Sequence, residues 1–359
     1  MLLKRILCMI CVVLFSFSSV NAVGESKPEV SAVSAILYCP DNNEILYEKS
    51  AHKKMAIASI TKIMTAIIAL ESDDKEVTFA YNMIAEGSSM YLKVGDVIKV
   101  SELVKGMMMV SGNDAANAIA VSLGGSREKF ADMMNEKADK LGMKDTHFVT
   151  PSGLDDEEHY STAYDMALLC SYAMKNGKFR DIVSQKSMSV EFISPKGQRI
   201  TYRNHNKLLS MYDGCIGIKT GFTKKAGRTL TSCAEKDGVR LIAVTLNDGN
   251  DWNDHISMYD YGFSQVEKIC LCDSTRIFEL PVVGSKKQSI KVMPKEECAV
   301  SVLKGDADRI TEKIYMPHFV YAPVRKNTVV GEVKYYLENK MIGKADLTVS
   351  ENCLYDNES

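Results

Sequence analysis

Two residues near the start of the chain have the types and the spacing of a nucleophile and its base. Ser59 stands where an apolar segment with helical periodicity begins, and Lys62 follows three residues later. Residues three apart share one face of a helix, so the Lys62 amine is expected beside the Ser59 hydroxyl. The N-terminus of that helix adds positive potential and free N–H groups where an oxyanion would form. The pair therefore predicts acyl transfer through serine, with an amine as the base.

The sequence around this pair separates it from others with the same spacing. Five Ser-x-x-Lys pairs occur in 359 residues, so the spacing alone decides little. In the other four pairs the lysine lies in a polar stretch, where a solvated side chain is the simpler interpretation. They are Ser50/Lys53, Ser72/Lys75, Ser126/Lys129 and Ser301/Lys304.

Two further groups carry side chains suited to the same chemistry. Ser111-Gly112-Asn113 lies between two apolar helical segments, and helix capping alone would explain it. Lys219-Thr220-Gly221, followed by Phe222, lies on an apolar strand-like segment, where a lysine is unusual as pure structure. The glycine would let the backbone of a ligand lie close against the strand.

Lys62 can accept the serine proton only in its neutral form, and a free lysine has a pKa of about 10.4. Burial and a second cation both favour the neutral form. Lys219 would supply that cation if its strand faces the helix. We therefore expect the pKa of Lys62 to be lowered.

Other kinds of site find no support. The sequence indicates neither a metal site nor a cofactor, because it holds no HExxH, GxGxxG, GxxxxGK[ST] or GxSxG motif. The nearest approach to a ligand cluster, Glu157-Glu158-His159, is interpreted as a solvated loop, since adjacent residues cannot easily converge on one ion. The 44 basic and 46 acidic side chains form no basic block, which argues against nucleic-acid binding.

The elements that must position these residues are strands, then many helices, then strands again. Strands are expected over 32–39, 44–48, 217–221, 228–234 and 239–246. Helices are expected from about 59, over 101–110, 113–123, 126–141, 162–175 and 252–261. The first hairpin and the last strands are far apart in sequence and are expected to share one sheet. From about 270 onward, short alternating segments between turn residues predict a small all-β domain.

The N-terminal segment is typical of an export signal. Residues 1–22 combine Lys4 and Arg5 with an apolar run and small residues before a cut after Ala22. An uncleaved anchor is the alternative, and both interpretations export the protein. Of the ten cysteines, Cys8 and Cys11 lie in this segment and eight lie after it. An even number of cysteines in an exported chain would suit disulfides. Several of the eight lie in apolar runs, however, so we expect buried free thiols.

The three groups, in this order, resemble those of the serine penicillin-recognising enzymes. The resemblance extends to MAIASITKIMTA (55–66), MMMVSGNDAANAIA (107–120), LGMKDTHFVTPSGL (141–154), NKLL (206–209) and GIKTGFTKKAG (217–227). These segments are similar to the low-molecular-weight D-alanyl-D-alanine carboxypeptidases, the penicillin-binding-protein-5-like peptidases. The resemblance covers about residues 30 to 270 strongly and the β-rich remainder more loosely.

The resemblance implies a fold and a division of the chain. The fold would be an α/β (α+β) serine β-lactamase/transpeptidase-like catalytic domain, with an antiparallel sheet and a helical subdomain, followed by a small all-β domain. The expected boundaries are a signal peptide over 1–22, the catalytic domain over 28–268, the β-rich domain over 270–350 and a polar tail over 351–359.

The resemblance also implies a role for each site residue. Ser59 would attack the carbonyl between two terminal D-alanines of a peptidoglycan stem peptide, with Ser111 relaying a proton and Asn113 orienting Lys62. The terminal carboxylate would be held by Lys219 and Thr220 beside Gly221, and the backbone N–H groups of Ser59 and Phe222 would form the oxyanion hole. β-Lactams would acylate Ser59, and the enzyme would work in cell-wall biogenesis outside the cytoplasmic membrane.

Two departures from the family pattern stand out. Many members have His where this chain has Phe222, although only the backbone of that position serves the oxyanion hole. Many members also end in an amphipathic helix that lies on the membrane, whereas residues 350–359 are polar, so such anchoring is unsupported. A β-lactamase and a penicillin or peptidoglycan sensor that acylates and stops are the alternative functions.

Overall fold

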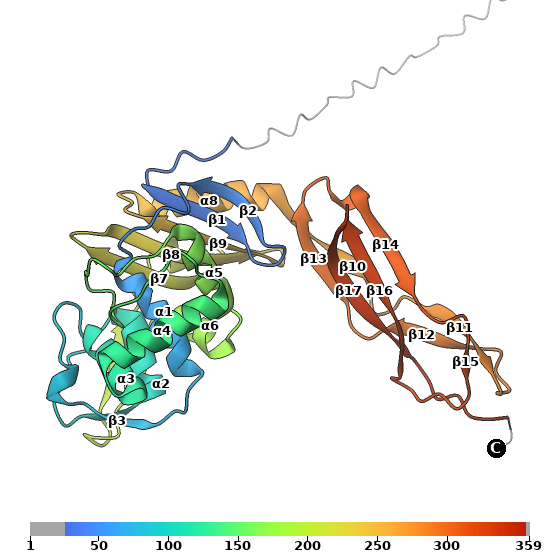
Figure 1. Ribbon diagram of the computed structural model, residues 1–359, viewed down its shortest axis with the longest axis horizontal. Coiled ribbons are helices and arrows are strands. Elements are labelled where there is room, and N and C mark those ends of the chain that lie inside the picture. Colours follow the sequence, from blue (N-terminus) through green and yellow to red (C-terminus); the bar gives the residue numbers. More distant parts are fainter. Residues whose placement is uncertain (1–25, 357–359) are drawn as a thin grey trace, which may run out of the picture.

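The computed structural model describes residues 26–356, which form two bodies joined at one end (Figure 1). The expected export signal lies outside the described residues. Within them no helix is long and apolar enough to cross a membrane.

The first body is built on a five-stranded antiparallel sheet in the order β2-β1-β9-β8-β7. Its strands are β1 (Ser34–Cys39), β2 (Glu44–Lys49), β7 (Cys215–Thr223), β8 (Gly227–Lys236) and β9 (Val239–Leu246). Strand β1 is fully buried between β2 and β9, so the first hairpin and the last strands share one sheet, as predicted. Strand β7 is left at the edge, where a ligand can lie along it.

Helices cover both faces of this sheet (Figure 1). Helix α8 (Asp251–Gln265) packs on one face over an apolar core that includes Leu230 and Met258. The other face carries the helical subdomain over a larger core. Its helices are α1 (Lys62–Leu70), α2 (Val100–Val110), α3 (Asn113–Gly124), α4 (Arg127–Leu141), α5 (Ala163–Ala173) and α6 (Gly177–Val183).

Helix α1 is the centre of the subdomain, and its residues 62–69 are all buried. The predicted amphipathic helix with one buried face is thus surrounded on every side. The five helices α2 to α6 all contact it. A charged Lys62 inside such a helix is therefore held far from solvent.

Two predicted helix caps are present. The Ser126 hydroxyl accepts a hydrogen bond from the Lys129 amide at the start of α4, and Gly142 ends the helix with a left-handed backbone. The Thr162 hydroxyl accepts from the Asp165 amide at the start of α5. The second half of the predicted capping box is missing, because the Asp165 carboxylate accepts from the amide and hydroxyl of the 145–146 segment instead.

Several elements were not predicted. They are the short helices α6 and α7 (Leu208–Met211), the two-stranded pairs β3 (Glu76–Thr78) with β4 (Val97–Lys99) and β5 (Ser187–Glu191) with β6 (Arg199–Arg203), and strand β10 (Val266–Cys272). Most are short, and β5 and β6 have one fully buried residue each, so their alternation is weak.

The second body is all-β, as predicted. A six-stranded sheet in the order β14-β16-β17-β12-β11-β15 stands beside the β10–β13 pair. Its strands are β11 (Phe278–Val283), β12 (Ser289–Pro294), β13 (Cys298–Leu303), β14 (Ile310–Tyr315), β15 (Val320–Tyr321), β16 (Val329–Leu337) and β17 (Lys340–Val349). Its apolar core is separate from the other two.

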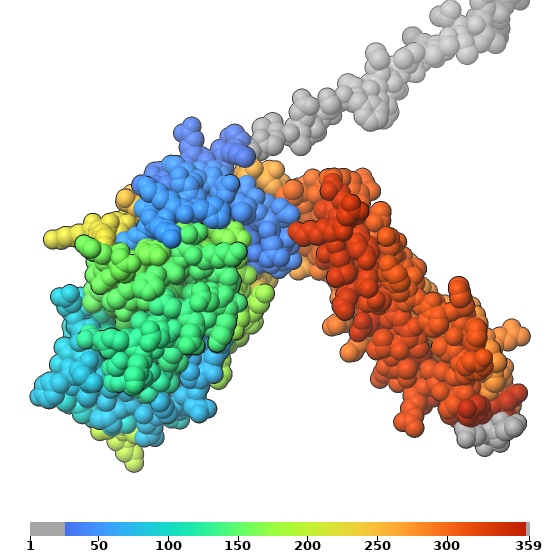
Figure 2. Space-filling view, viewed as in Figure 1, coloured from blue at the N-terminus to red at the C-terminus, as the bar shows by residue number. Residues whose placement is uncertain are grey.

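Polar contacts join the two bodies where the β1–β2 turn meets β13. The Asn42 side-chain amide donates to the Ser301 carbonyl at 3.0 Å, and the Ser301 hydroxyl donates to Asp41 at 2.9 Å. Lys268 and Lys340 reach the same turn. Beyond this junction the two bodies diverge (Figure 2).

The eight cysteines within residues 26–356 are free thiols, as expected. Six of them are buried, while Cys215 is half-buried and Cys270 is exposed. Burial raises the pKa of Cys170 to about 12, which leaves this thiol unreactive.

The Thr162 cap gives a first prediction. Thr162→Ala should lower the free energy of unfolding by about 1 kcal/mol, because one buried amide of α5 loses its partner. Urea denaturation of the whole chain would measure the shift. Thr201→Ala, at a hydroxyl contact on the exposed β5–β6 pair, is the control and should have a smaller effect. Equal effects of the two changes would contradict the cap.

Candidate active site

Ser59 lies in a tight 3-10 turn, Ala58–Thr61, that leads into α1. The predicted helix therefore begins with a narrower turn than expected. In a 3-10 turn the side chains at i and i+3 eclipse each other, which brings them closer than in an α-helix. The Lys62 Nζ lies 2.8 Å from the Ser59 Oγ.

The Lys62 amine has three oxygen neighbours, and they fix the direction of its lone pair. Besides Ser59, it contacts Asn113 Oδ1 at 2.7 Å and the Ser152 carbonyl at 2.6 Å. Both of these oxygens can only accept a hydrogen bond. A neutral amine donates its two protons to them, so its lone pair faces the serine hydroxyl. The arrangement can therefore take the Ser59 proton.

Burial lowers the pKa of Lys62 well below its usual 10.5, and the nearby Lys219 lowers it further, while Asp114 opposes both effects. This agrees with the expectation from the sequence. Lys219 is itself 2% exposed, and burial lowers its pKa to about 7. The site thus holds two buried amines that both resist protonation.

The Ser111-Gly112-Asn113 group faces this pair. Ser111 ends α2 with a left-handed backbone (φ 62°) and is almost buried at the cavity wall. Asn113 is the first residue of α3, and its amide bridges Lys62 and the Glu86 carbonyl. No side-chain hydrogen bond caps α3 at its described N-terminus. Helix capping, the simpler interpretation of this group, therefore does not account for it.

Strand β7 closes the site from the opposite side. Gly221 lies so close to the nucleophile that a Cβ on it would be 2.9 Å from the Ser59 backbone nitrogen and 2.4 Å from Thr229 Oγ1. Only glycine fits here without moving the Ser59 N–H. Phe222 follows and is 66% exposed.

The predicted residues converge on one cavity of about 400 Å³. Ser59, Ser111, Thr220, Gly221 and Phe222 line it directly. Lys62, Asn113 and Lys219 are buried, and Lys62 reaches Ser59 from within the protein. All eight residues singled out by the sequence are thus brought together, although they come from three distant segments of the chain.

Two functional contacts were missed. The Ser152 carbonyl belongs to the Pro151-Ser152-Gly153 turn, where Gly153 has φ +83° and lies against the Ala58 carbonyl. A Cβ on Gly153 would clash with that carbonyl, so the turn can sit against the nucleophile only with glycine. The Pro-Ser-Gly triplet is typical of a turn, but no neighbouring residue in the sequence indicates that this turn contacts Lys62.

The prediction for His159 was wrong. The side chain is 3% exposed rather than solvated, although Glu157 and Glu158 beside it are exposed. Its Nδ1 accepts from the amides of Val149 and Thr150, so Nε2 carries the proton toward Thr61 Oγ1 at 2.8 Å. Burial lowers its pKa to about 4. A neutral histidine therefore ties the Ser152 turn to the residue before Lys62.

Within residues 26–356 no group of three or more histidine, cysteine or acidic side chains is arranged to hold a metal ion. A lysine-activated serine beside a glycine-lined strand edge, with a second buried lysine, defines a serine acyl-transfer site.

Comparison with known proteins places this site in a family. Residues 21–250 match the model of the D-alanyl-D-alanine carboxypeptidase family, and residues 273–353 match that of the penicillin-binding protein 5 C-terminal domain. The chain belongs to the D-alanyl-D-alanine carboxypeptidase family of serine peptidases. The match favours neither a β-lactamase nor a sensor.

Individual relatives extend over most of the chain. It is 30% identical to the D-alanyl-D-alanine carboxypeptidase DacF of Bacillus subtilis, covering 94% of this chain and 90% of that protein. It is 32% identical to DacC of Escherichia coli, covering 94% and 89%. The crystal structure of penicillin binding protein 5 from Haemophilus influenzae superposes with a TM-score of 0.68 at 26% identity, covering 92% of this chain and all of that one.

The buried Lys219 gives a prediction about stability. Its pKa of about 7 in the folded chain lies below that of an unfolded lysine. The unfolded state therefore binds more protons between these values, and the folded state is penalised as the pH falls. Lys219→Met should unfold at a higher urea concentration than the unchanged chain at pH 6, and this advantage should shrink toward pH 10.

Lys224→Met, on the exposed turn of the same hairpin, is the matched control and should show no such dependence on pH. A Lys219→Met variant that is less stable than the unchanged chain at pH 6 would contradict the penalty.

Proposed function

We propose that this chain removes the terminal D-alanine from peptidoglycan stem peptides that end in D-alanyl-D-alanine, through an acyl-enzyme on Ser59. The observation that carries the proposal is the contact between the buried Lys62 amine and the Ser59 hydroxyl, whose atoms lie 2.8 Å apart. Ser59 lines the cavity together with Gly221 of β7. The family membership supports the substrate class.

The first step is attack on the carbonyl between the two D-alanines. Lys62 takes the proton as the Ser59 oxygen bonds to the carbonyl carbon. The negative charge moves to the carbonyl oxygen, where the backbone N–H groups of Ser59 and Phe222 receive it. The close approach of Gly221 to the Ser59 nitrogen supports this position for the oxyanion.

The second step expels the terminal D-alanine. The carbon–nitrogen bond breaks, and the leaving amine needs the proton that Lys62 has taken. Ser111, at the cavity wall, is suited to relay it, and Asn113 keeps the lysine amine directed at Ser59. Lys219 and Thr220 hold the carboxylate of the leaving residue. Water then hydrolyses the ester, and a peptide one residue shorter leaves.

This substrate lies outside the cytoplasmic membrane, which gives the predicted export signal over 1–22 a reason. We therefore propose a site of action in the cell envelope, in the biogenesis of the wall. The cavity also suits β-lactams, whose strained amide and carboxylate imitate the end of the stem peptide, as covalent inhibitors.

The direct experiment measures D-alanine release from a diacetyl-lysyl-D-alanyl-D-alanine peptide. Release by the unchanged chain and none by Ser59→Ala would support the proposal. Labelling by penicillin without release of D-alanine would instead indicate a sensor. Rapid nitrocefin hydrolysis with slow release of D-alanine would indicate a β-lactamase.

The two lysines also predict the pH dependence of acylation. The base must be neutral, so the rate of Ser59 acylation by benzylpenicillin should rise with pH through the lowered pKa of Lys62. It should fall above about pH 7, as Lys219 loses the charge that binds the carboxylate. Stopped-flow acylation between pH 4 and 10 would measure both limbs. A rate that climbs steadily toward pH 10.5 would rule out Lys62 as the base.

A further inference from the structure

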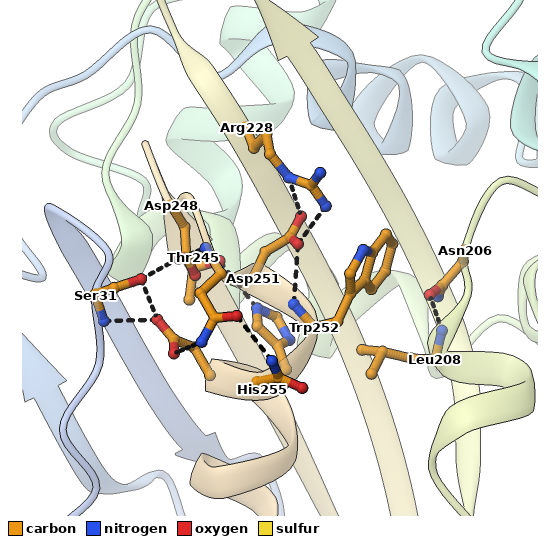
Figure 3. Close-up of polar contacts among 12 residues, drawn as sticks. Ser31, Asn206, Leu208, Arg228, Thr245, Asp248, Asp251, Trp252 and His255 are labelled. Atoms are coloured by element: carbon orange, nitrogen blue, oxygen red, sulfur yellow. Dashed lines mark hydrogen bonds and ion pairs between the residues drawn. The ribbon is translucent and has the colours of Figure 1, made fainter.

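A buried carboxylate that the proposed mechanism does not use lies next to the site. Asp114 is the second residue of α3, directly after Asn113, and it is 4% exposed. Asp251, which is buried to a similar degree, is paired with the guanidinium of Arg228 (Figure 3). Asp114 takes part in no ion pair among residues 26–356. A buried charge without an ion-pair partner is costly, so its other contacts must stabilise it.

The Asp114 carboxylate holds a segment of the chain, residues 86–92, that lies against the start of α3. Its Oδ1 accepts a hydrogen bond from the Met90 amide at 2.9 Å. Its Oδ2 accepts from the Ser89 hydroxyl at 2.6 Å and from the Leu92 amide at 3.1 Å. The carboxylate accepts every one of these bonds, as an ionised group does. The charge is therefore kept inside the protein, where it also fixes the segment.

The same segment in turn fixes a residue of the site. The Glu86 carbonyl accepts from Asn113 Nδ2, and the Ser88 carbonyl accepts from the Asn113 backbone amide, each at 2.7 Å. With its Nδ2 held in this way, the Asn113 side chain turns its Oδ1 toward Lys62, which it contacts at 2.7 Å. Ser88 also lines the reaction cavity. The carboxylate that holds the segment thus acts on the site through Asn113.

The charge of Asp114 acts on the base as well. Among the described residues, two charged groups shift the pKa of Lys62, since Lys219 from β7 lowers it and Asp114 from α3 raises it. His159, which lies beside the turn that leads into α1, is neutral because burial lowers its pKa to about 4. When Lys62 takes the Ser59 proton, it becomes a cation in a place where burial disfavours one. Asp114 is an anion placed to stabilise that cation.

We propose that Asp114 is a positioning residue for the reaction. Its charge stabilises the protonated Lys62 that forms during the attack, and its hydrogen bonds keep Asn113 directed at that amine through the 86–92 segment. This inference rests on the proposed function and adds to it a residue that touches neither the substrate nor the reacting atoms. The proton still moves from Ser59 Oγ to Lys62 Nζ, and the stability of the cation so formed depends on Asp114.

The test follows the pH dependence of Ser59 acylation by benzylpenicillin between about pH 3 and 8. Asp114→Asn removes the charge and nearly keeps the size of the side chain. The pH at which the acidic side of the profile reaches half its maximum should fall by about 1 unit, the lower end of the effect of one nearby charge. The maximum rate should fall by up to about 10-fold, because the protonated amine is less stable by that factor. A carboxylate that served only the fold would leave this midpoint where it is.

Two further variants separate the charge from the hydrogen bonds. Asp114→Ser also removes the charge but keeps a hydroxyl that can accept from an amide, so it replaces Asp114→Asn if that variant does not fold. It should move the midpoint in the same direction. Ser89→Ala removes one bond to the carboxylate and keeps the charge, so the midpoint should stay unchanged.

Asp165→Asn is the matched control. Asp165 is 3% exposed and lies in the first turn of α5, where its carboxylate also accepts from an amide and a hydroxyl of an earlier segment. Its charge does not contribute to the pKa of Lys62. The variant should therefore unfold at a lower urea concentration and keep the midpoint of the unchanged chain.

An unchanged midpoint in Asp114→Asn and Asp114→Ser would overturn the inference, and so would an equal shift in Asp165→Asn. The proposed function would stand in either case as long as the unchanged chain releases D-alanine from diacetyl-lysyl-D-alanyl-D-alanine. Failure of that release would overturn the proposed function, and the inference with it.

Discussion

The site depends on keeping one amine neutral inside the protein. A lysine loses its charge only where water is excluded, and here the exclusion is supplied by α1, whose residues from Lys62 to Ala69 are all buried. The two carbonyl oxygens of Asn113 and Ser152 then satisfy its two protons. Without both acceptors, the lone pair would have no fixed direction, and burial alone would give an inert amine. The helical subdomain therefore buries the Lys62 amine and directs its lone pair at Ser59.

This requirement explains why the contributing segments are far apart in the sequence. A buried amine needs neighbours on every side, and the chain supplies them from α1, from the start of α3, from the 150–153 turn and from β7. Strand β7 reaches the site because β1 joins the first hairpin to β9, which sets the edge of the sheet against the 3-10 turn of Ser59. The parts that react are local, whereas the scaffold that holds them depends on contacts across most of the first 265 residues.

The sequence was sufficient for the parts whose cause is local. The caps at Ser126 and Thr162, the main helices and the strands of the large sheet follow from periodicity and from capping side chains. Two features predicted the residues of the site. They are the spacing of Ser59 and Lys62 and the presence of Lys219 in an apolar strand. The Ser152 carbonyl was missed because every residue has a carbonyl, so no residue type marks it. His159 was misjudged because two exposed glutamates precede it, and its burial is decided by Thr61 and Val149, which lie elsewhere in the chain.

Several of the groups around the nucleophile are main-chain atoms. The Ser152 carbonyl orients the lysine, and the Ser59 N–H lies against Gly221. Every residue has a main-chain carbonyl and every residue except proline has an N–H, so most substitutions at these positions leave the groups in place unless they shift the backbone. Substitutions that preserve the reaction are therefore expected mainly at exposed side chains of the cavity mouth, such as Phe222. A change at the cavity mouth can therefore alter which molecules bind while Ser59 and Lys62 keep their positions.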